Sequence, residues 1–236
     1  MNEMIQYRLR FSKEKELRFL SHLELMRALE RAFRRAMLPL AYSEGFHPHP
    51  KLSFGPALAV GISSNDEYLD FQLTGEVAPS EIKERLNQTL PGGIRVIAVV
   101  KISRHAKPLN ALINRAAYSV LLKCDPGKMG EIVHWLKGLV DLAEIVVQRV
   151  SKEGQKFVNI RPWLHNLTIK EINGDILEIR LTGEIGSGGN LRPEDITGGI
   201  PHPVEILSIA RIGLWHEEKG TVLKPLDFTC NTEGDK

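Results

Sequence analysis

Three segments of this chain recur in the same order at nearly constant spacing. Leu73-Thr74-Gly75-Glu76 returns as Leu181-Thr182-Gly183-Glu184, 108 residues later. Two further pairs are QYRLRF (6–11) with AYSVLL (117–122) and IRVIAVVKI (94–102) with VEILSIARI (204–212), at offsets of 111 and 110 residues. A constant offset at three places predicts an internal duplication. The 236 residues should therefore form two similar units of about 110 residues each.

The first half predicts the element order β-α-β-β-α-β. Alternating apolar residues indicate strands, and apolar residues three and four positions apart indicate helices. Strands are expected over 5–11, 52–59, 68–74 and 94–102, and helices over 21–37 and 80–90. This is the order of a ferredoxin-like unit.

The second half predicts the same order with one additional candidate strand. Strands are expected over 117–124, 145–150, 176–182 and 204–212, helices over 129–139 and 192–196, and a further strand over 167–172 with Asn173-Gly174 as its hairpin turn. The predicted fold class is therefore α+β, with two tandem ferredoxin-like halves from an internal duplication. The domain prediction places the halves at 1–102 and 116–215, a linker at 103–115 and a polar tail at 216–236.

Composition excludes several classes of function. The net charge is only +2 and the isoelectric point is near 8.5, so the whole chain is not a polycation. Residues 1–60 nevertheless hold ten Lys/Arg and six Asp/Glu. The two cysteines, Cys124 and Cys230, form no metal-ligand motif, so no metal and no cofactor is expected. No signal peptide or run of about 18 apolar residues is present, which predicts a cytoplasmic protein without membrane contact.

The expected first helix has a clear start and a basic stripe. Ser21 with Glu24 three residues later predicts a capping box. Arginines follow at i, i+4, i+7 and i+8, which places them on one side of the helix. The candidate phosphate-binding residues are Arg18, Arg27, Arg31, Arg34, Arg35 and Lys51. A guanidinium suits bidentate phosphate contact, although a solvated face with pairs such as Glu30–Arg34 explains the pattern equally well.

A constrained loop follows that helix. Pro48 and Pro50 fix their own φ angles and hold the preceding histidines in extended backbone, while Gly45 permits a sharp turn. The candidate recognition residues are Tyr42, Ser43, Gly45, Phe46, His47 and His49. We weigh four interpretations: a rigid recognition loop for RNA or a protein, a His-x-His metal site without a signalled third ligand, a general acid–base role for His22 or His47, and a structural turn.

The second half has a glycine-rich loop of its own. It contains Gly186, Gly188, Gly189, Asn190 and Arg192. Exposed amides ahead of Pro193 at a helix start could cradle an anion. The loop matches neither a Walker motif nor a dinucleotide fingerprint, so a flexible connection is the alternative.

Five segments of the first half are distinctive: LRFLSHL (17–23), MRALERA (26–32), YS (42–43), GFHPHP (45–50) and SFGP (53–56). With them the chain resembles a bacterial family of unknown function that is linked to radical S-adenosylmethionine enzymes, specifically over residues 5–75 and more loosely over the remainder. In that family the domain is fused behind a radical enzyme or encoded beside one, often near genes for ribosomal proteins and a ribonuclease. This chain resembles the stand-alone form because it lacks the cluster-binding CxxxCxxC. The resemblance implies a radical-enzyme partner and leans towards RNA, but assigns no residue a role.

Three functional hypotheses follow. The first is a non-catalytic RNA-binding or substrate-presenting partner of a radical S-adenosylmethionine enzyme, in tRNA or rRNA modification or processing. The second is a metal-independent RNA-processing enzyme that uses His22 or His47. The third is a protein-interaction module that does not contact RNA.

Overall fold

The computed structural model describes residues 4–151 and 154–228. The chain divides into two compact units. The first comprises the described residues up to Ile113 and those from Leu214 onwards, and the second comprises Asn114–Gly213. Both units combine an antiparallel sheet with a few helices, so the α+β class is confirmed. No helix in the described ranges is both long and apolar enough to cross a bilayer.

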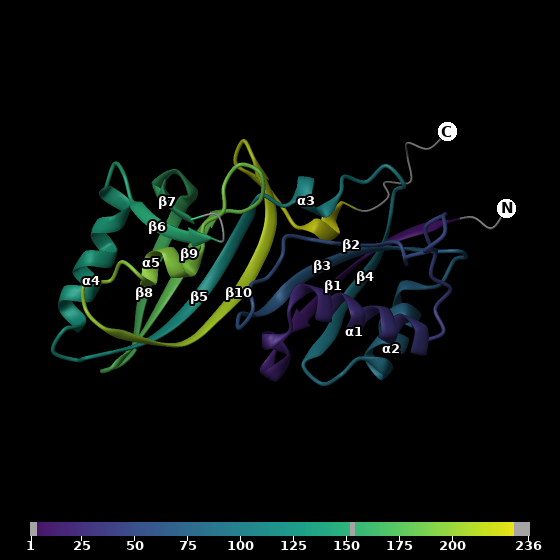
Figure 1. The fold of residues 1–236 in the computed structure, drawn as a ribbon, viewed down its shortest axis with the longest axis horizontal. Helices are drawn as coiled ribbons and strands as arrows, with labels where there is room; N and C mark the ends of the chain where they lie inside the picture. Colours follow the sequence, from purple (N-terminus) through teal and green to yellow (C-terminus); the bar gives the residue numbers. More distant parts are fainter. Residues whose placement is uncertain (1–3, 152–153, 229–236) are drawn as a thin grey trace. The chain divides into compact units, whose positions relative to one another are not determined.

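The first unit has the predicted ferredoxin-like order. Its elements are β1 (Ile5–Lys13), η1 (Lys15–Phe19), α1 (His22–Arg35), β2 (Leu52–Phe54), β3 (Ser63–Leu73), α2 (Pro79–Thr89), β4 (Ile94–Ile102) and α3 (Leu109–Leu112), followed later by β11 (Thr221–Leu223) and η4 (Pro225–Asp227). The strand order is β4-β1-β3, with β2 paired to β3, and all three pairings are antiparallel. Helices α1 and α2 lie on one face of this sheet (Figure 1).

The core of the first unit lies between that face and the helices. Alternate residues of β1 point into it, and Tyr7, Leu9 and Phe11 are almost fully buried. Phe33 of α1 meets Phe71 of β3 with ring centroids 4.9 Å apart. Burial of such side chains contributes about 1.5–3 kcal/mol each, which explains why the amphipathic helix docks here.

Local signals set the boundaries of α1. The predicted capping box is confirmed: the Glu24 amide donates to Ser21 Oγ at 3.3 Å, and the Ser21 amide donates to Glu24 Oε2 at 2.8 Å. The helix ends at Arg35, two residues before the predicted end. Met37 has φ of +54°, a left-handed conformation that no helix can continue through.

Two strand predictions differ from the structure in length. Strand β2 ends at Phe54, not at residue 59, because Gly55 and Pro56 interrupt the extended backbone. Strand β3 begins at Ser63, five residues earlier than predicted. The first residues of β3 include Asp66 and Glu67, which are buried although they are charged. Because these buried positions are not apolar, the sequence does not show the alternation of apolar and polar residues that marks a strand.

The second unit repeats the arrangement with an insertion. Its elements are β5 (Arg115–Cys124), α4 (Met129–Gly138), η2 (Leu139–Asp141), β6 (Val146–Ser151), β7 (Gly154–Asn159), η3 (Arg161–Trp163), β8 (Leu164–Asn173), β9 (Ile176–Glu184), α5 (Pro193–Thr197) and the first part of β10 (Val204–Glu218). The strand order is β10-β5-β9-β8. The predicted strand at 145–150 does not join this sheet: as β6 it pairs with β7, which the sequence analysis missed, and β8 pairs with β9 instead.

The three repeated segments lie on equivalent strands. The pair QYRLRF and AYSVLL lies on β1 and β5, the Leu-Thr-Gly-Glu pair lies at the ends of β3 and β9, and the pair IRVIAVVKI and VEILSIARI lies on β4 and β10. The two members of each pair therefore lie on the corresponding strand of their units, which is the first, the third or the last main strand. The duplication itself stays a prediction.

The end of the chain is built into the first unit. Residues predicted as a tail from 216 onwards include the end of β10 and a hairpin in which His216 lies opposite Leu223. The Leu214 amide donates to Asp66 Oδ2 at 2.6 Å. The predicted linker also differs, because it contains α3 with Leu109 and Leu112 buried. The first unit is thus discontinuous in sequence.

Candidate nucleic-acid interface

Three arginines share the outer face of α1. Arg27, Arg31 and Arg34 are exposed, and their i, i+4, i+7 spacing places them in a row. We call these three residues the arginine row. Within the described part of the chain, the guanidinium groups of Arg27 and Arg31 form no hydrogen bond or ion pair. Two positive groups therefore stand ready for an external anion.

The other three predicted phosphate-binding residues are engaged by neighbouring groups. Arg35 lies on α1 beside the arginine row, but its Nη2 donates to the Thr89 carbonyl of α2 at 2.5 Å, which ties it to the neighbouring helix. Arg18 lies in η1 before the helix, with its guanidinium 4.8 Å from the centre of the Phe19 ring. Lys51 Nζ lies 3.7 Å from the sulfur of Met4. Four of the six candidates therefore lie on α1, one of them held by α2, and Arg18 and Lys51 lie outside this helix.

The constrained loop forms a short arm whose two sides are hydrogen-bonded to each other. The Lys51 amide donates to the Ala41 carbonyl at 2.9 Å, and the Ser43 amide donates to the His49 carbonyl at 2.8 Å. The His49 amide in turn donates to Ser43 Oγ at 3.0 Å. Gly45 at the tip has φ of +123°, which only glycine adopts easily. We call residues 41–51 the arm.

The arm presents its recognition candidates to solvent. The Phe46 side chain is fully exposed, with a relative accessibility of 102%, and His47 and His49 are exposed beside it. No group of three or more His, Cys, Asp or Glu that could hold a metal occurs in the described ranges. The metal interpretation of the His-x-His pattern therefore gains no support from the structure.

A polar contact joins the arm to the arginine row. A hydrogen bond between Tyr42 and Arg34, together with the nearby Glu30 carboxylate, raises the Arg34 pKa above its usual range. Arg34 Nη2 also lies 2.6 Å from Glu30 Oε1. Tyr42 is half-exposed at the base of the arm. Arg34 and Tyr42 therefore interact at the end of α1, and RNA binding by these residues stays a prediction.

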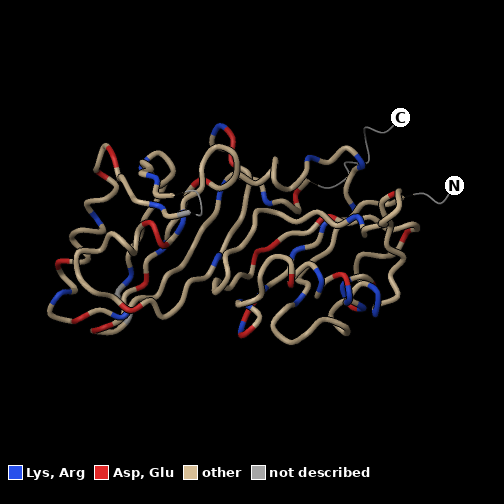
Figure 2. The backbone as a smooth tube through the Cα atoms, viewed as in Figure 1, with Lys and Arg blue, Asp and Glu red and all other residues tan. Residues whose placement is uncertain are grey.

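Charges outside this region are mixed. Lys and Arg positions alternate with Asp and Glu positions along the tubes of both units (Figure 2). The net charge of +2 agrees with this distribution. Any attraction for a polyanion therefore rests on local groups.

The two histidine candidates for acid–base chemistry lie at opposite ends of α1. His22 is the first residue of the helix, and its ring meets Phe54 edge-on at 5.2 Å. His47 belongs to the arm, which contacts the last turn of the helix. A helix of 14 residues is about 20 Å long. His22 and His47 therefore form no joint site.

A groove that the sequence analysis missed lies beside His22. Its volume is about 350 Å³. The lining residues are His22, Met26, Leu52, Ser53, Phe54, Gly55, Ala57 and Asn110. Asn110 belongs to α3, inside the segment predicted as a linker. The only available signal was the SFGP run, which resembled the family without indicating a cavity.

A smaller pocket shares part of its lining with the groove. It has a volume of about 10 Å³ and shares His22, Phe54, Gly55 and Ala57 with the groove. Lys13 and Glu67 also line it, and both are buried. Lys13 Nζ donates to the Leu20 carbonyl at 2.7 Å.

The glycine-rich loop of the second unit is engaged internally. The Arg192 amide donates to Asp195 Oδ2 at 3.0 Å, so a carboxylate of the chain already lies at the start of α5. Arg149 forms an ion pair with Asp195, donates to the Asn190 carbonyl at 2.6 Å and lies over the Trp163 ring. These contacts favour a structural role, and anion binding by this loop stays a prediction.

Glycine at two positions of that region serves close packing. A Cβ on Gly189 would lie 2.3 Å from atoms of the Trp163 ring, and one on Gly183 would lie 2.4 Å from Leu191 Cδ2. Gly186 and Gly188 are exposed. Gly189 and Gly183 are therefore required because Trp163 and Leu191 pack against them, whereas Gly186 and Gly188 serve turn formation.

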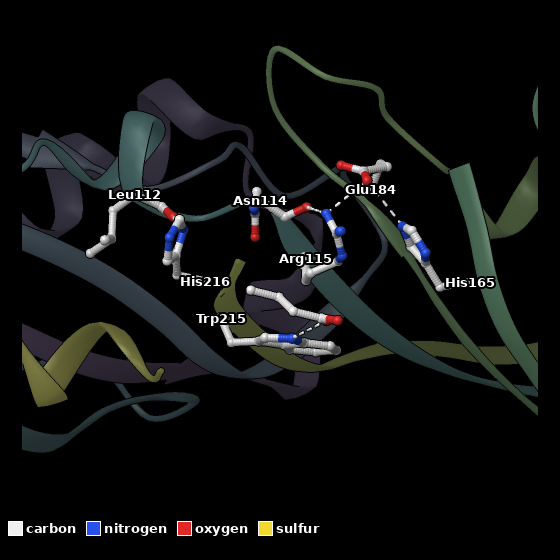
Figure 3. Close-up of polar contacts among 8 residues, drawn as sticks. Leu112, Asn114, Arg115, His165, Glu184, Trp215 and His216 are labelled. Atoms are coloured by element: carbon white, nitrogen blue, oxygen red, sulfur yellow. Dashed lines mark hydrogen bonds and ion pairs between the residues drawn. The ribbon is translucent and has the colours of Figure 1, made fainter. Parts of the chain in front are cut away.

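Several histidines that carry no motif are also bonded within their own units. In the second unit, Glu184 Oε1 lies 2.7 Å from Arg115 Nη1 and 3.0 Å from His165 Nε2 (Figure 3). In the first unit, His216 Nδ1 lies 2.7 Å from the Leu112 carbonyl (Figure 3). These contacts mark structural histidines.

The fold and these sites define an α+β protein of ferredoxin-like type with a basic, aromatic surface on its first helix. The chain belongs to a family described as an uncharacterized protein conserved in bacteria (DUF2344), whose model matches residues 6–193. No curated protein matches the chain.

One of the similar solved structures is consistent with the fold class. A chain of a Cbf5-Nop10-Gar1 complex is similar over 88% of this chain and 48% of its own length, with 12% identity and a TM-score of 0.50. The present chain thus spans about half the length of that structure. The small subunit of acetolactate synthase from Thermotoga maritima covers 90% of this chain and is itself covered to 94%, with 12% identity, but its TM-score of 0.26 is too low to carry an argument.

Proposed function

We propose that this protein is a non-catalytic RNA-binding subunit that presents RNA to a separate radical S-adenosylmethionine enzyme in the cytoplasm. The observation that carries the proposal is the exposed surface of α1 and the arm. Phe46 of the arm is fully exposed, and Arg27 and Arg31 of the arginine row form no hydrogen bond or ion pair among the described residues.

This chemistry suits single-stranded RNA. Unstacked bases bind on exposed aromatic rings, and each stacked base contributes about 1–3 kcal/mol. Guanidinium groups bind the phosphates between those bases. Phe46 offers the ring, while Arg27, Arg31 and Arg34 offer the charge. A structural turn would have no need of a phenylalanine that is entirely in water.

The radical-enzyme partner is proposed from the resemblance in residues 5–75. The chain contains two cysteines, and neither belongs to a CxxxCxxC motif. Cys124 is buried, and this burial raises the pKa of its thiol, which disfavours the thiolate that binds a cluster. The iron–sulfur cluster would therefore belong to the partner. The chemical step, in tRNA or rRNA modification or processing, would take place there.

The test compares RNA binding at two salt concentrations. Labelled bulk cellular RNA is titrated with the protein at about 50 and 200 mM salt, because each phosphate contact on a single strand contributes about 0.7 to the logarithmic salt slope. The variant Arg27→Ala/Arg31→Ala/Arg34→Ala should lower that slope by about 2. The matched control neutralises three exposed cations elsewhere, Lys83→Ala/Arg95→Ala/Lys137→Ala, and should leave the slope unchanged.

Other outcomes contradict the proposal in distinguishable ways. An equal slope in the wild type and the arginine variant would remove the arginine row from RNA binding. RNA cleavage in the presence of EDTA that stops with His47→Ala would show an enzyme. No binding at low salt, with co-purification of a radical enzyme from nuclease-treated lysate, would show a protein-interaction module.

A further inference from the structure

We propose that the groove beside His22 holds one unstacked nucleobase of the RNA that the arginine row binds. This inference rests on the proposed function and deepens it, because it assigns base recognition to a second place on the same helix. The groove and the row lie on successive stripes of α1: His22 and Met26 line the groove, and Arg27 follows Met26 on the next stripe. A strand that crosses α1 from the arginine row would reach the groove.

The size of the groove suits a single nucleoside. Its volume of about 350 Å³ lies near the lower end of the range for small-ligand sites, about 300–1,000 Å³. The smaller pocket holds about one water at 10 Å³, so a base would remain in the groove.

The walls suit the flat face of a base. Met26, Leu52 and Ala57 supply apolar surface, and the Phe54 ring stands at 78° to the ring of His22. Such an edge-to-face pair forms a corner with two aromatic surfaces. An unstacked base that enters it exchanges water for apolar contact on its faces.

The polar groups suit the edge of a base. Asn110 offers an amide donor and acceptor, Ser53 a hydroxyl, and His22 its ring nitrogens. None of the eight lining residues is Asp, Glu, Lys or Arg. This set favours an uncharged heteroaromatic ring with alternating donors and acceptors over a phosphate or a carboxylate.

The smaller pocket, which shares four lining residues with the groove, has charged walls. Lys13 and Glu67 line it with relative accessibilities of 1% and 6%. Lys13 is held by the Leu20 carbonyl, at the start of the turn that leads into α1. Buried charges of this kind keep water and polar atoms in fixed positions, which favours selection between bases that differ in their edges.

The experiment measures selectivity among bases. Homopolymer oligonucleotides of A, C, G and U are compared at about 50 mM salt with the full chain. The wild type should prefer one homopolymer by about tenfold, the scale of a single-base discrimination. Ala57→Phe, which fills the groove from an exposed position, should abolish the preference, and Asn110→Ala should reduce it. Asn166→Ala, an exposed asparagine on β8, is the matched control.

The outcomes separate this inference from the proposed function. Equal affinity of the wild type for all four homopolymers, with the steep salt dependence retained, would overturn the base site and leave RNA binding standing. A preference that persists in Ala57→Phe would also overturn it. An absence of salt-dependent RNA binding would overturn both. Thermal unfolding of Ala57→Phe and Asn110→Ala verifies that each variant is folded.

Discussion

The third main strand of each unit carries an acidic residue three positions before the repeated Leu-Thr-Gly-Glu, and the two acids differ in environment. Burial raises the pKa of Asp70, an effect that two hydrogen bonds from Arg8 only partly offset. Hydrogen bonds from Arg180, and more weakly from Ser119, hold the pKa of Glu178 below its usual value against the opposing effect of burial. Equivalent positions therefore need not keep equivalent chemistry.

The difference comes from what covers each acid. In the first unit, Arg8 also donates to the Pro225 carbonyl at 3.0 Å and to the Lys107 carbonyl at 3.1 Å, so segments outside the repeat enclose the pair. In the second unit, the Arg180 side chain that pairs with Glu178 is more than half exposed. The two units share the strand that carries the acid, and the segments outside the repeat determine whether that acid is buried.

The same contrast applies to the insertions between helix and strand. The arm lies between α1 and β2, and the β6–β7 hairpin lies between α4 and β8. Each exposes a phenylalanine, Phe46 and Phe157 respectively. Phe46 belongs to the arm that follows α1, where Arg27 and Arg31 form no ion pair among the described residues, whereas Arg149 on β6 is paired with Asp195. An exposed aromatic ring therefore does not by itself define an RNA-binding site, because nearby cations must also be free to bind phosphate.

The largest predicted effect comes from removing one partner of the buried Arg8–Asp70 ion pair. Arg8→Ala leaves the Asp70 carboxylate buried without its partner, which should lower the free energy of unfolding by about 3–5 kcal/mol. Arg8→Met/Asp70→Leu should recover most of that loss, because no charge remains buried. Ser119→Ala, at the position equivalent to Arg8, should cost about 1 kcal/mol. Urea denaturation measures all three, and an equal cost for Arg8→Ala and Ser119→Ala would contradict the comparison.

A smaller loss is expected from the two glycines of the repeat. A Cβ on Gly183 would lie 2.5 Å from the Trp163 carbonyl oxygen, whereas a Cβ on Gly75 would meet nothing within 4 Å. Gly183→Ala should therefore destabilise the protein by about 1–3 kcal/mol. Gly75→Ala should stay within about 0.5 kcal/mol of the wild type. If both glycines tolerate alanine equally in thermal unfolding, the close packing around Gly183 is disproved.

The two exposed phenylalanines should differ in RNA binding and not in stability. Phe46→Ala should weaken binding of single-stranded RNA by about 1–3 kcal/mol, the value of one stacked base. Phe157→Ala should leave the affinity unchanged, and both variants should unfold within about 0.5 kcal/mol of the wild type. Fluorescence anisotropy of a labelled oligonucleotide measures the affinity. An equal loss in both variants would indicate nonspecific apolar adsorption.

The smallest predicted effect concerns acid stability. A carboxyl whose pKa is lower in the folded than in the unfolded chain stabilises the fold above its unfolded pKa of about 4.3, and that contribution is lost as the pH falls through the folded value. Glu178→Gln removes it. The variant should be less stable than the wild type at pH 7 by less than about 1 kcal/mol, with the difference vanishing by about pH 2–3. A difference that is constant with pH would show that the charge is unimportant.

Local features were readable from the sequence, and non-local ones were not. The capping box of Ser21 and Glu24 and the basic row on α1 depend on residues within one or two turns of helix. The Arg8–Asp70 pair joins residues 62 positions apart, and the groove needs Asn110 from α3 beside His22 from α1. Neither leaves a periodic signal. Strand β7 was missed because its residues are mostly exposed and lack the alternation that marks a half-buried strand.

The discontinuity of the first unit has a consequence for synthesis on the ribosome. A nascent chain grows at about 5–20 residues per second, and domains usually fold in order from the N-terminus. Here Asp66 lacks its hydrogen-bond donor until Leu214 has been synthesised, and Arg8 lacks one of its acceptors until Pro225 has been synthesised. The second unit, Asn114–Gly213, can emerge and fold while these buried polar groups lack their partners. The unit that is translated first is therefore completed last.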